Sequence, residues 1–114
     1  MRRIVFLLLT SLIVGTQTSP AAAQWVTGLR TVLDNCQNAN LDPDPRIAAC
    51  DQLIHANIAS HGVLAALYNN RGAAYEAKKD VEHAAQDYEK ALALKSDFPE
   101  AQTNLDRLKS EKTN

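Results

Sequence analysis

The sequence predicts an all-α protein, and three observations lead to this fold class. Beyond residue 24, apolar residues recur three or four positions apart in successive segments, which is the spacing of one face of an α-helix. Proline, aspartate, asparagine, serine and glycine gather between these segments, where they favour turns and helix ends. No window of the chain has the pattern of a β-strand. We therefore expect helices joined by short turns.

The first 23 residues have the pattern of a secretory signal peptide. Met1-Arg2-Arg3 is positively charged, residues 4–15 are mostly apolar, and Ala21-Ala22-Ala23 supplies small residues for cleavage. The apolar run is shorter than the roughly 20 residues of a spanning helix, which disfavours a retained membrane anchor. A twin-arginine signal is disfavoured because no cofactor motif follows. We expect an exported protein, periplasmic in a Gram-negative envelope or, alternatively, secreted.

Cleavage after Ala23 would leave 91 of the 114 residues, which is one small domain, residues 24–114. Removing Arg2 and Arg3 from the 12 basic residues leaves 10 against 13 acidic ones, a net charge of −3. This weak and scattered charge does not indicate a basic surface that would bind nucleic acid or anionic lipid. We expect no nucleic-acid partner and no stable membrane insertion after cleavage.

Both cysteines, Cys36 and Cys50, lie in the expected domain. In an exported chain, an even number of cysteines is more often disulfide-bonded than catalytic. A Cys36–Cys50 bridge would close a loop of 15 residues counting both ends, worth about 3 kcal/mol in the chain-entropy model. The sequence therefore predicts this disulfide.

The first two helices are expected on either side of an Asp-Pro-Asp-Pro stretch, residues 42–45. Trp25, Leu29, Val32 and Cys36 lie at steps of four, three and four, so one helix presents them on one face. The prolines stop this helix, and Asp44 is expected to cap the next one, with Pro45 in its first turn. The second helix would cover about 45–56. Its inward residues would be Ile47, Ala49, Cys50, Leu53 and Ile54.

Three more helices are expected after the loop at residues 57–62. Ser60 or His61 would begin a helix running to about residue 78, with Leu64, Leu67, Tyr68 and Tyr75 as its apolar positions. Lys79-Asp80 makes a turn, and a fourth helix covers about 81–94. The segment Ser96-Asp97-Phe98-Pro99 ends it, and a last helix covers about 99–110.

The third and fourth helices carry a specific motif. It consists of Tyr68, Arg71, Gly72 and Tyr75, followed by Ala84, Tyr88 and Ala91. This spacing resembles the tetratricopeptide repeat (TPR), a helix–turn–helix unit of 34 residues, over roughly residues 65–98. Three positions depart from the family: Ser96 stands where proline is usual, Lys79 where glycine is usual, and Arg71 where leucine is common. The alternative is a generic helical hairpin. It is disfavoured because so many residues occur at the spacing of the repeat.

The small residues of this motif have a physical reason. Glycine inside a helix costs about 1 kcal/mol relative to alanine, so Gly72 needs a compensating contact. Because Gly72 has no side chain, we expect the fourth helix to approach closely there, with Ala84 opposite. Tyr75 and Tyr88 are expected to fill the space between the two helices further along. Ala91 would leave room for the helix that packs next.

The rest of the domain resembles incomplete repeats. Residues 24–62 read as a degenerate repeat in either of two frames, one matching Ala49, Leu53 and Ala56 to the motif and the other matching Cys50, Ile54 and Asn57. Residues 63–98 are the good repeat, and residues 99–114 are a capping helix and tail. The polar residues Gln102, Asp106, Lys109 and Glu111 suit the solvent-facing side of a terminal helix. The resemblance implies a short right-handed α-solenoid of about five helices.

Catalytic and metal-binding patterns are not found. His55, His61 and His83 have none of the zinc-ligand spacings, and surface positions explain them better. Cys50 with His55 would be a conceivable thiol enzyme, but a disulfide removes the thiolate. Asp42 and Asp44 are explained by turn and cap formation. We expect a non-catalytic protein without cofactor or metal.

Binding is the function that the resemblance implies. In TPR proteins the first helix of each repeat lines a concave groove for peptides or partner helices. The groove-facing candidates here are Ala66, Asn69, Asn70, Ala73 and Glu76. The alternative is a structural or assembly subunit of an envelope complex with no groove function. Self-association into a homo-oligomer, with Trp25 at the interface, is also open.

Overall fold

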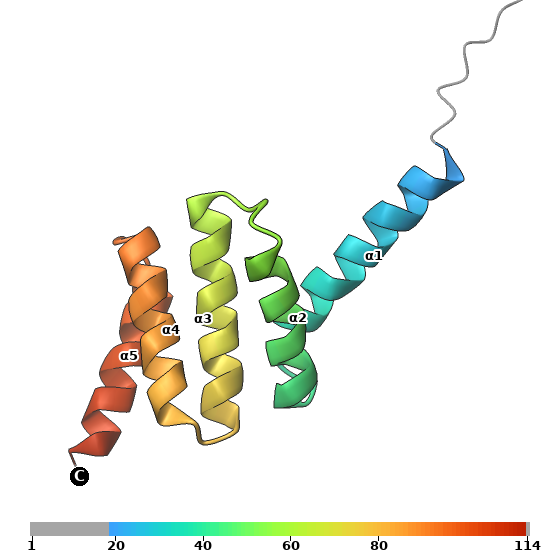
Figure 1. Ribbon diagram of the computed structural model, residues 1–114. Coiled ribbons are helices and arrows are strands. Elements are labelled where there is room, and N and C mark those ends of the chain that lie inside the picture. Colours follow the sequence, from blue (N-terminus) through green and yellow to red (C-terminus); the bar gives the residue numbers. More distant parts are fainter. Residues whose placement is uncertain (1–18, 114) are drawn as a thin grey trace, which may run out of the picture.

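The computed structural model describes residues 19–113, and this part of the chain forms five helices and no strand (Figure 1). Each helix packs mainly against its neighbours in the sequence, and successive helices from α2 onward run in opposite directions. This is the arrangement of a short helical solenoid, so the predicted fold class is confirmed. The helices are α1 (Pro20–Gln37), α2 (Pro43–His55), α3 (His61–Ala77), α4 (Val81–Leu94) and α5 (Pro99–Lys112).

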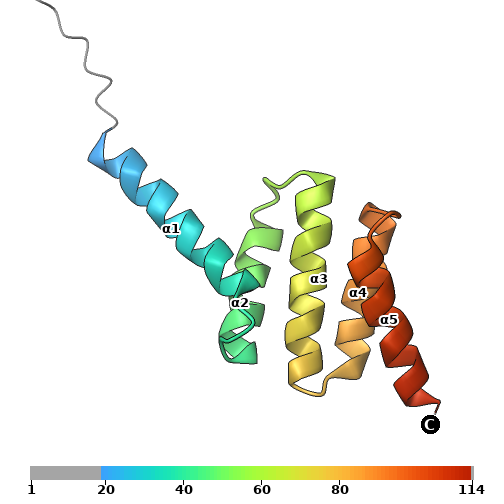
Figure 2. The ribbon, with the colours of Figure 1, turned by 180° about the vertical axis from the view of Figure 1, so that it is seen from behind.

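Helix α1 is covered by the other helices only along its C-terminal half. Cys36 is buried and Val32 and Leu33 are partly buried against α2, whereas every residue from Pro20 to Thr31 is exposed. The N-terminal half accordingly extends away from α2–α5 (Figures 1 and 2). Of the four residues expected on one face of this helix, Val32 and Cys36 are covered, whereas Trp25 and Leu29 face solvent.

The expected signal peptide lies mostly outside the described residues, and its cleavage stays a prediction. Ser19 is the N-cap of α1 and its hydroxyl accepts a hydrogen bond from the Ala22 amide, so the residues of the expected cleavage site form the first turn of α1. No helix within residues 19–113 is both long enough and apolar enough to cross a membrane.

Helix α2 begins two residues earlier than predicted. Its N-cap is Asp42, not Asp44, and Pro43 and Pro45 both lie in the first turn. The first four amide groups of a helix have no partner within it, so proline loses no hydrogen bond there. Asp44 precedes Pro45 and is still helical, so the sequence rule that residues before proline avoid the helical region does not hold here.

Helices α3 and α4 form the hairpin that carries the motif, and their ends follow local chemistry. The Ser60 hydroxyl accepts from the Val63 amide at the start of α3. Lys79 in the turn has φ = 66°, in the left-handed region that favours glycine, which explains why glycine is usual at this position. Asp80 then caps α4, and its carboxylate accepts from the His83 amide.

Gly72 lies directly against α4. A Cβ atom at this position would lie 2.8 Å from Cε1 of Tyr88 and 3.2 Å from the backbone oxygen of Ala84. Ala84 is opposite, as expected, but the nearest atoms belong to the Tyr88 ring, which was expected further along the helices. The fully buried Tyr88 ring therefore packs on the bare backbone of α3, and this contact offsets the helix-propensity cost of glycine.

The substitution Gly72→Ala is expected to lower the free energy of unfolding by up to about 2 kcal/mol, because the overpacking cost of roughly 1–3 kcal/mol exceeds the gain in helix propensity of about 1 kcal/mol. Gly28→Ala is the matched control, since a Cβ there meets no atom within 4 Å. That variant should be neutral or more stable by up to about 1 kcal/mol. Urea unfolding followed by circular dichroism measures both, and a stabilised Gly72→Ala protein would contradict the packing argument.

The last helix closes the solenoid. Ala101, Leu105 and Leu108 of α5 are buried, and Ala101 packs in one cluster with Ala65 and Ala91. Ala91 thus leaves room for the next helix, as the motif implies. The residues Gln102, Asp106, Lys109 and Glu111 are exposed, as expected for a terminal helix.

Helices α1 and α2 form a second hairpin, which is joined by the Cys36–Cys50 disulfide. The Cα atoms are 4.8 Å apart and both cysteines are fully buried, so the predicted bridge is confirmed. Burial follows neither expected frame of the degenerate repeat completely. Ala49 and Leu53 are buried as the first frame requires, but Ala56 is exposed.

Candidate functional site

The five residues predicted to face a groove all lie on α3, but the structure does not bring them onto one open surface. Asn69 is buried, with 2% of its surface exposed. Its amide nitrogen donates to Glu100 Oε1 at 3.0 Å, and its amide oxygen accepts from Asn104 Nδ2 at 3.2 Å. The expectation for Asn69 is therefore wrong, because polar side chains of α5 reach over α3 and use its amide to join the two helices.

Glu76 is also bound within the protein. Its carboxylate accepts hydrogen bonds from both terminal nitrogens of the Arg107 guanidinium and from the Tyr88 hydroxyl, the latter at 2.9 Å. Arg107, and then the Tyr88 hydroxyl, hold the pKa of Glu76 below its ordinary value. Burial, and then the Glu76 carboxylate, raise the pKa of Tyr88. Glu76 thus lies in a polar link between α3, α4 and α5.

Ala73 and Glu76 line a groove between the C-terminal half of α3 and α5, with a volume of about 510 Å³. The α5 residues Asn104, Arg107 and Glu111 form much of its other wall. Ala66 and Asn70 are half-buried on α3 and do not line this groove. Only two of the five predicted residues therefore meet in one cavity.

The sequence contains a signal for the α5 side of this groove that was not used. Residues Asn104 and Arg107 follow Asn70 and Ala73 by 34 positions, the length of one repeat. Because α5 takes the place of the first helix of a following repeat, the candidate positions on α3 should have counterparts on α5 at this offset. Applying the offset to all five candidates would have found both residues.

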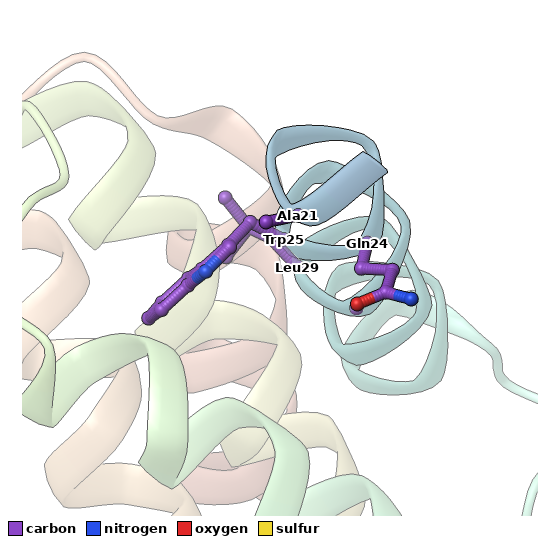
Figure 3. A pocket seen from close by; sticks show the side chains of 5 residues that line it. Ala21, Gln24, Trp25 and Leu29 are labelled. Atoms are coloured by element: carbon purple, nitrogen blue, oxygen red, sulfur yellow. The ribbon is translucent and has the colours of Figure 1, made fainter. Parts of the chain in front are cut away.

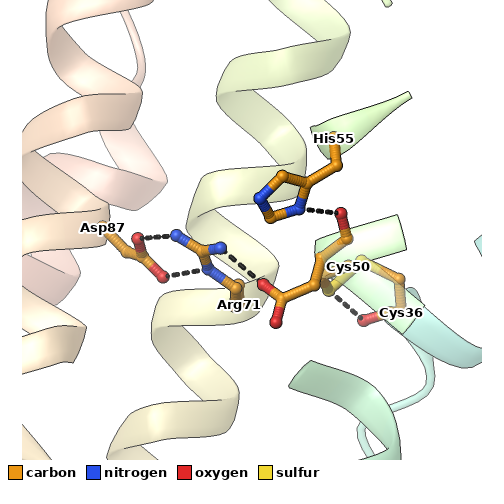
Figure 4. Close-up of polar contacts among 6 residues, drawn as sticks. Cys36, Cys50, His55, Arg71 and Asp87 are labelled. Carbon is orange, nitrogen blue, oxygen red and sulfur yellow. Dashed lines mark hydrogen bonds and ion pairs between the residues drawn. A yellow bond between two sulfur atoms is a disulfide. The ribbon is translucent and has the colours of Figure 1, made fainter. Parts of the chain in front are cut away.

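Arg71, noted for departing from the motif, joins three helices (Figure 4). Its Nε and Nη2 atoms donate to the two carboxylate oxygens of Asp87 at 2.8 and 2.7 Å, and Nη1 donates to Asp51 at 2.6 Å. The guanidinium also lies 5.2 Å from the centre of the Tyr68 ring. The hydrogen bonds from Arg71 to Asp87 and Asp51 outweigh burial and raise the pKa of Arg71. Arg71 is a structural cation between α2, α3 and α4.

The cysteine and histidine side chains do not form a reactive site in this structure. Cys50 is bonded to Cys36, so the Cys50–His55 hypothesis has no thiolate nucleophile. His55 Nδ1 lies 2.8 Å from the backbone oxygen of Asp51, one turn earlier in its own helix (Figure 4). His55, His61 and His83 are all exposed, and no three metal-binding side chains gather among residues 19–113.

A second candidate surface is apolar and lies at the N-terminal end of the molecule. Trp25 exposes 81% of its surface, and its ring extends from α1 while Gln24 points to another side of the helix (Figure 3). Beside it, a groove of about 260 Å³ is lined by residues from α1, α2, the loop after α2, and α3. Sequence analysis singled out Trp25 but not the groove.

Comparison with known proteins agrees with the packing of α3 and α4. The family model described as tetratricopeptide repeat matches residues 65–98, which include most of α3, all of α4 and the turn before α5. Comparison with curated proteins and with solved structures gave no match. Together with the contact of Gly72 with Tyr88, the family match identifies residues 65–98 as a tetratricopeptide repeat.

Proposed function

We propose that the protein is an exported, non-catalytic interaction module that binds a peptide or a helix of a partner protein. Tetratricopeptide repeats build concave binding surfaces from their first helices. The observation that carries the proposal is the groove of about 510 Å³ between α3 and α5. Helix α3 is the first helix of the repeat, and α5 takes the place of the first helix of a following repeat.

The groove has the mixed chemistry that peptide binding requires. Ala73 and Ala77 provide apolar surface, and Asn104, Arg107 and Glu111 provide hydrogen-bonding and charged groups, of which Asn104 and Arg107 also bond to α3. The small side chain of Ala73 leaves room on the α3 wall of the groove. An extended peptide would place its side chains on the apolar surface and its polar groups against α5.

The substitution Ala73→Arg is expected to weaken binding about tenfold or more, because a long side chain would occupy the groove. Ala93→Arg is the matched control, since Ala93 is exposed on α4 and does not line the groove. Peptides selected from a displayed random library are titrated by fluorescence polarisation against both variants and the parent protein. Equal affinities for all three proteins would contradict the groove as the binding site.

A structural or assembly subunit is a second candidate, favoured by the exposed apolar residues Trp25, Val26 and Ile58. The variant Asn69→Ala would not distinguish the two functions, because it would remove buried hydrogen bonds between α3 and α5. Ala73 and Trp25 can do so, since one lines the α3–α5 groove and the other lies on α1. An adaptor should depend on the first position, and an assembly subunit on the second.

A further inference from the structure

Helix α1 has a continuous apolar stripe of which only the C-terminal half is covered. Six apolar residues beyond the expected cleavage site fall on one side of this helix with spacings of one and three: Trp25, Val26, Leu29, Val32, Leu33 and Cys36. The last three pack in one apolar cluster with residues of α2 and α3. In the N-terminal half, Trp25, Val26 and Leu29 are 81%, 68% and 48% exposed.

The apolar groove begins where the bare part of the stripe ends. Its lining includes Leu29, Leu33, Leu53, Ile58, Val63 and Leu67, of which Leu29, Ile58 and Val63 are exposed. Its volume of about 260 Å³ exceeds the roughly 150 Å³ of a cavity that holds a benzene ring. One indole ring is therefore a suitable occupant in size and polarity.

We propose that two copies of this chain associate through their α1 helices, which lie antiparallel across a twofold axis at Leu29. In a twofold dimer, a protruding side chain of one copy enters a groove of the other copy. Within each chain, that side chain and that groove must therefore lie at equal distances from the axis, in opposite directions along the helix. Trp25 precedes Leu29 by four residues, and Leu33, on the wall of the groove, follows it by four. Each distance is about 6 Å along the helix. The Trp25 ring of each copy then enters the groove of the other.

The charges of α1 do not oppose this contact. Within α1 the charged residues are Arg30 and Asp34, which lie about 100° and 140° around the helix from Leu29. Both therefore stay at the outer edge of the pair of helices. Within α1, the residues that meet across the axis are therefore apolar.

The exposed apolar area is in the range that a dimer of this size needs. Trp25, Val26, Leu29, Ile58 and Val63 together expose on the order of 500 Å² per copy. A standard interface buries about 800 Å² per partner, of which roughly 56–65% is apolar. The same five side chains would supply that apolar share. This dimer goes beyond the proposed function and does not depend on it, because the α3–α5 groove lies at the other end of the molecule.

Trp25 is the sole tryptophan of the chain, so its fluorescence reports on this contact alone. The protein is expressed from its whole coding sequence, its N-terminus is determined by mass spectrometry, and light scattering is recorded from about 1 to 500 µM, a span of dissociation constants typical of modest interfaces. We expect the mass to rise to that of two chains as the tryptophan emission shifts to the blue. A monomer with unshifted emission throughout this range overturns the proposal.

The substitution Trp25→Glu should weaken the dimer about 30-fold or more, the effect of losing a central aromatic residue. Gln24→Glu adds the same charge one residue away on another side of α1 and should leave the dimer unchanged. Both positions are exposed, so neither variant should lose its fold. A dimer that persists in Trp25→Glu overturns the proposal, as does an emission shift that appears only when lipid vesicles or another protein are added.

Discussion

The substitution Arg71→Leu is expected to lower the free energy of unfolding by about 3–5 kcal/mol, although leucine is common at this position of the repeat. The reason is Asp87, whose side chain is only 6% exposed and which accepts two hydrogen bonds from Arg71. Without the guanidinium, a carboxylate would remain buried and unpaired between α3 and α4. Asp51, the other partner, is 39% exposed and can turn to water.

The double variant Arg71→Leu, Asp87→Leu should recover most of this loss, because replacing both members of a buried ion pair with apolar residues is often close to neutral. Lys78→Met provides a matched control. Lys78 also pairs across helices, with Asp44 of α2, but both side chains are well exposed, and such pairs contribute about 0–1 kcal/mol. Urea unfolding of the four proteins measures the effects. An Arg71→Leu protein as stable as the parent would show that the buried Asp87 carboxylate does not need Arg71 as its partner.

Those parts of the fold that depend on local chemistry were predictable from the sequence. Helix α4 begins and ends at the residues expected, because Asp80 supplies a cap and the segment after Leu94 cannot continue the helix. Ser60 likewise caps α3. The position of Gly72 against α4 was predictable too, since glycine in mid-helix needs a close neighbour to offset its cost. Each of these signals lies within a few residues of the feature that it predicts.

The partners of polar side chains were not predictable in the same way. Asn69 lies next to Asn70 on α3, yet Asn69 is buried by Glu100 and Asn104 of α5, more than 30 positions away. Arg71 finds Asp87 and Asp51 on two other helices. Helical periodicity gives the direction of a side chain, but not which residue of another helix reaches it. Ala73 and Glu76 of the predicted set line the α3–α5 groove, whereas Asn69 is buried and bonded to α5.

Loss of the Cys36–Cys50 disulfide is expected to lower the free energy of unfolding by about 3 kcal/mol, the entropy of closing a 15-residue loop. The comparison is between the parent protein and Cys36→Ala, Cys50→Ala in urea, both with and without reductant. In a solenoid each unit is stabilised mainly by its neighbours, so the loss should be concentrated in α1 and α2. Hydrogen exchange should show faster exchange there than in α3 and α4.

This location follows from how α1 is held. It packs mainly on α2, only its C-terminal half is covered, and the buried bridge lies at the end of that half. The reduced protein should therefore keep its α3–α5 packing while α1 separates from α2, and reductant should leave the alanine variant unaffected. Uniform loss of protection across all five helices would contradict this. Because disulfides persist in oxidising compartments, we expect the protein made in a reducing cytosol to match the alanine variant, and protein made in an oxidising compartment to match the oxidised one.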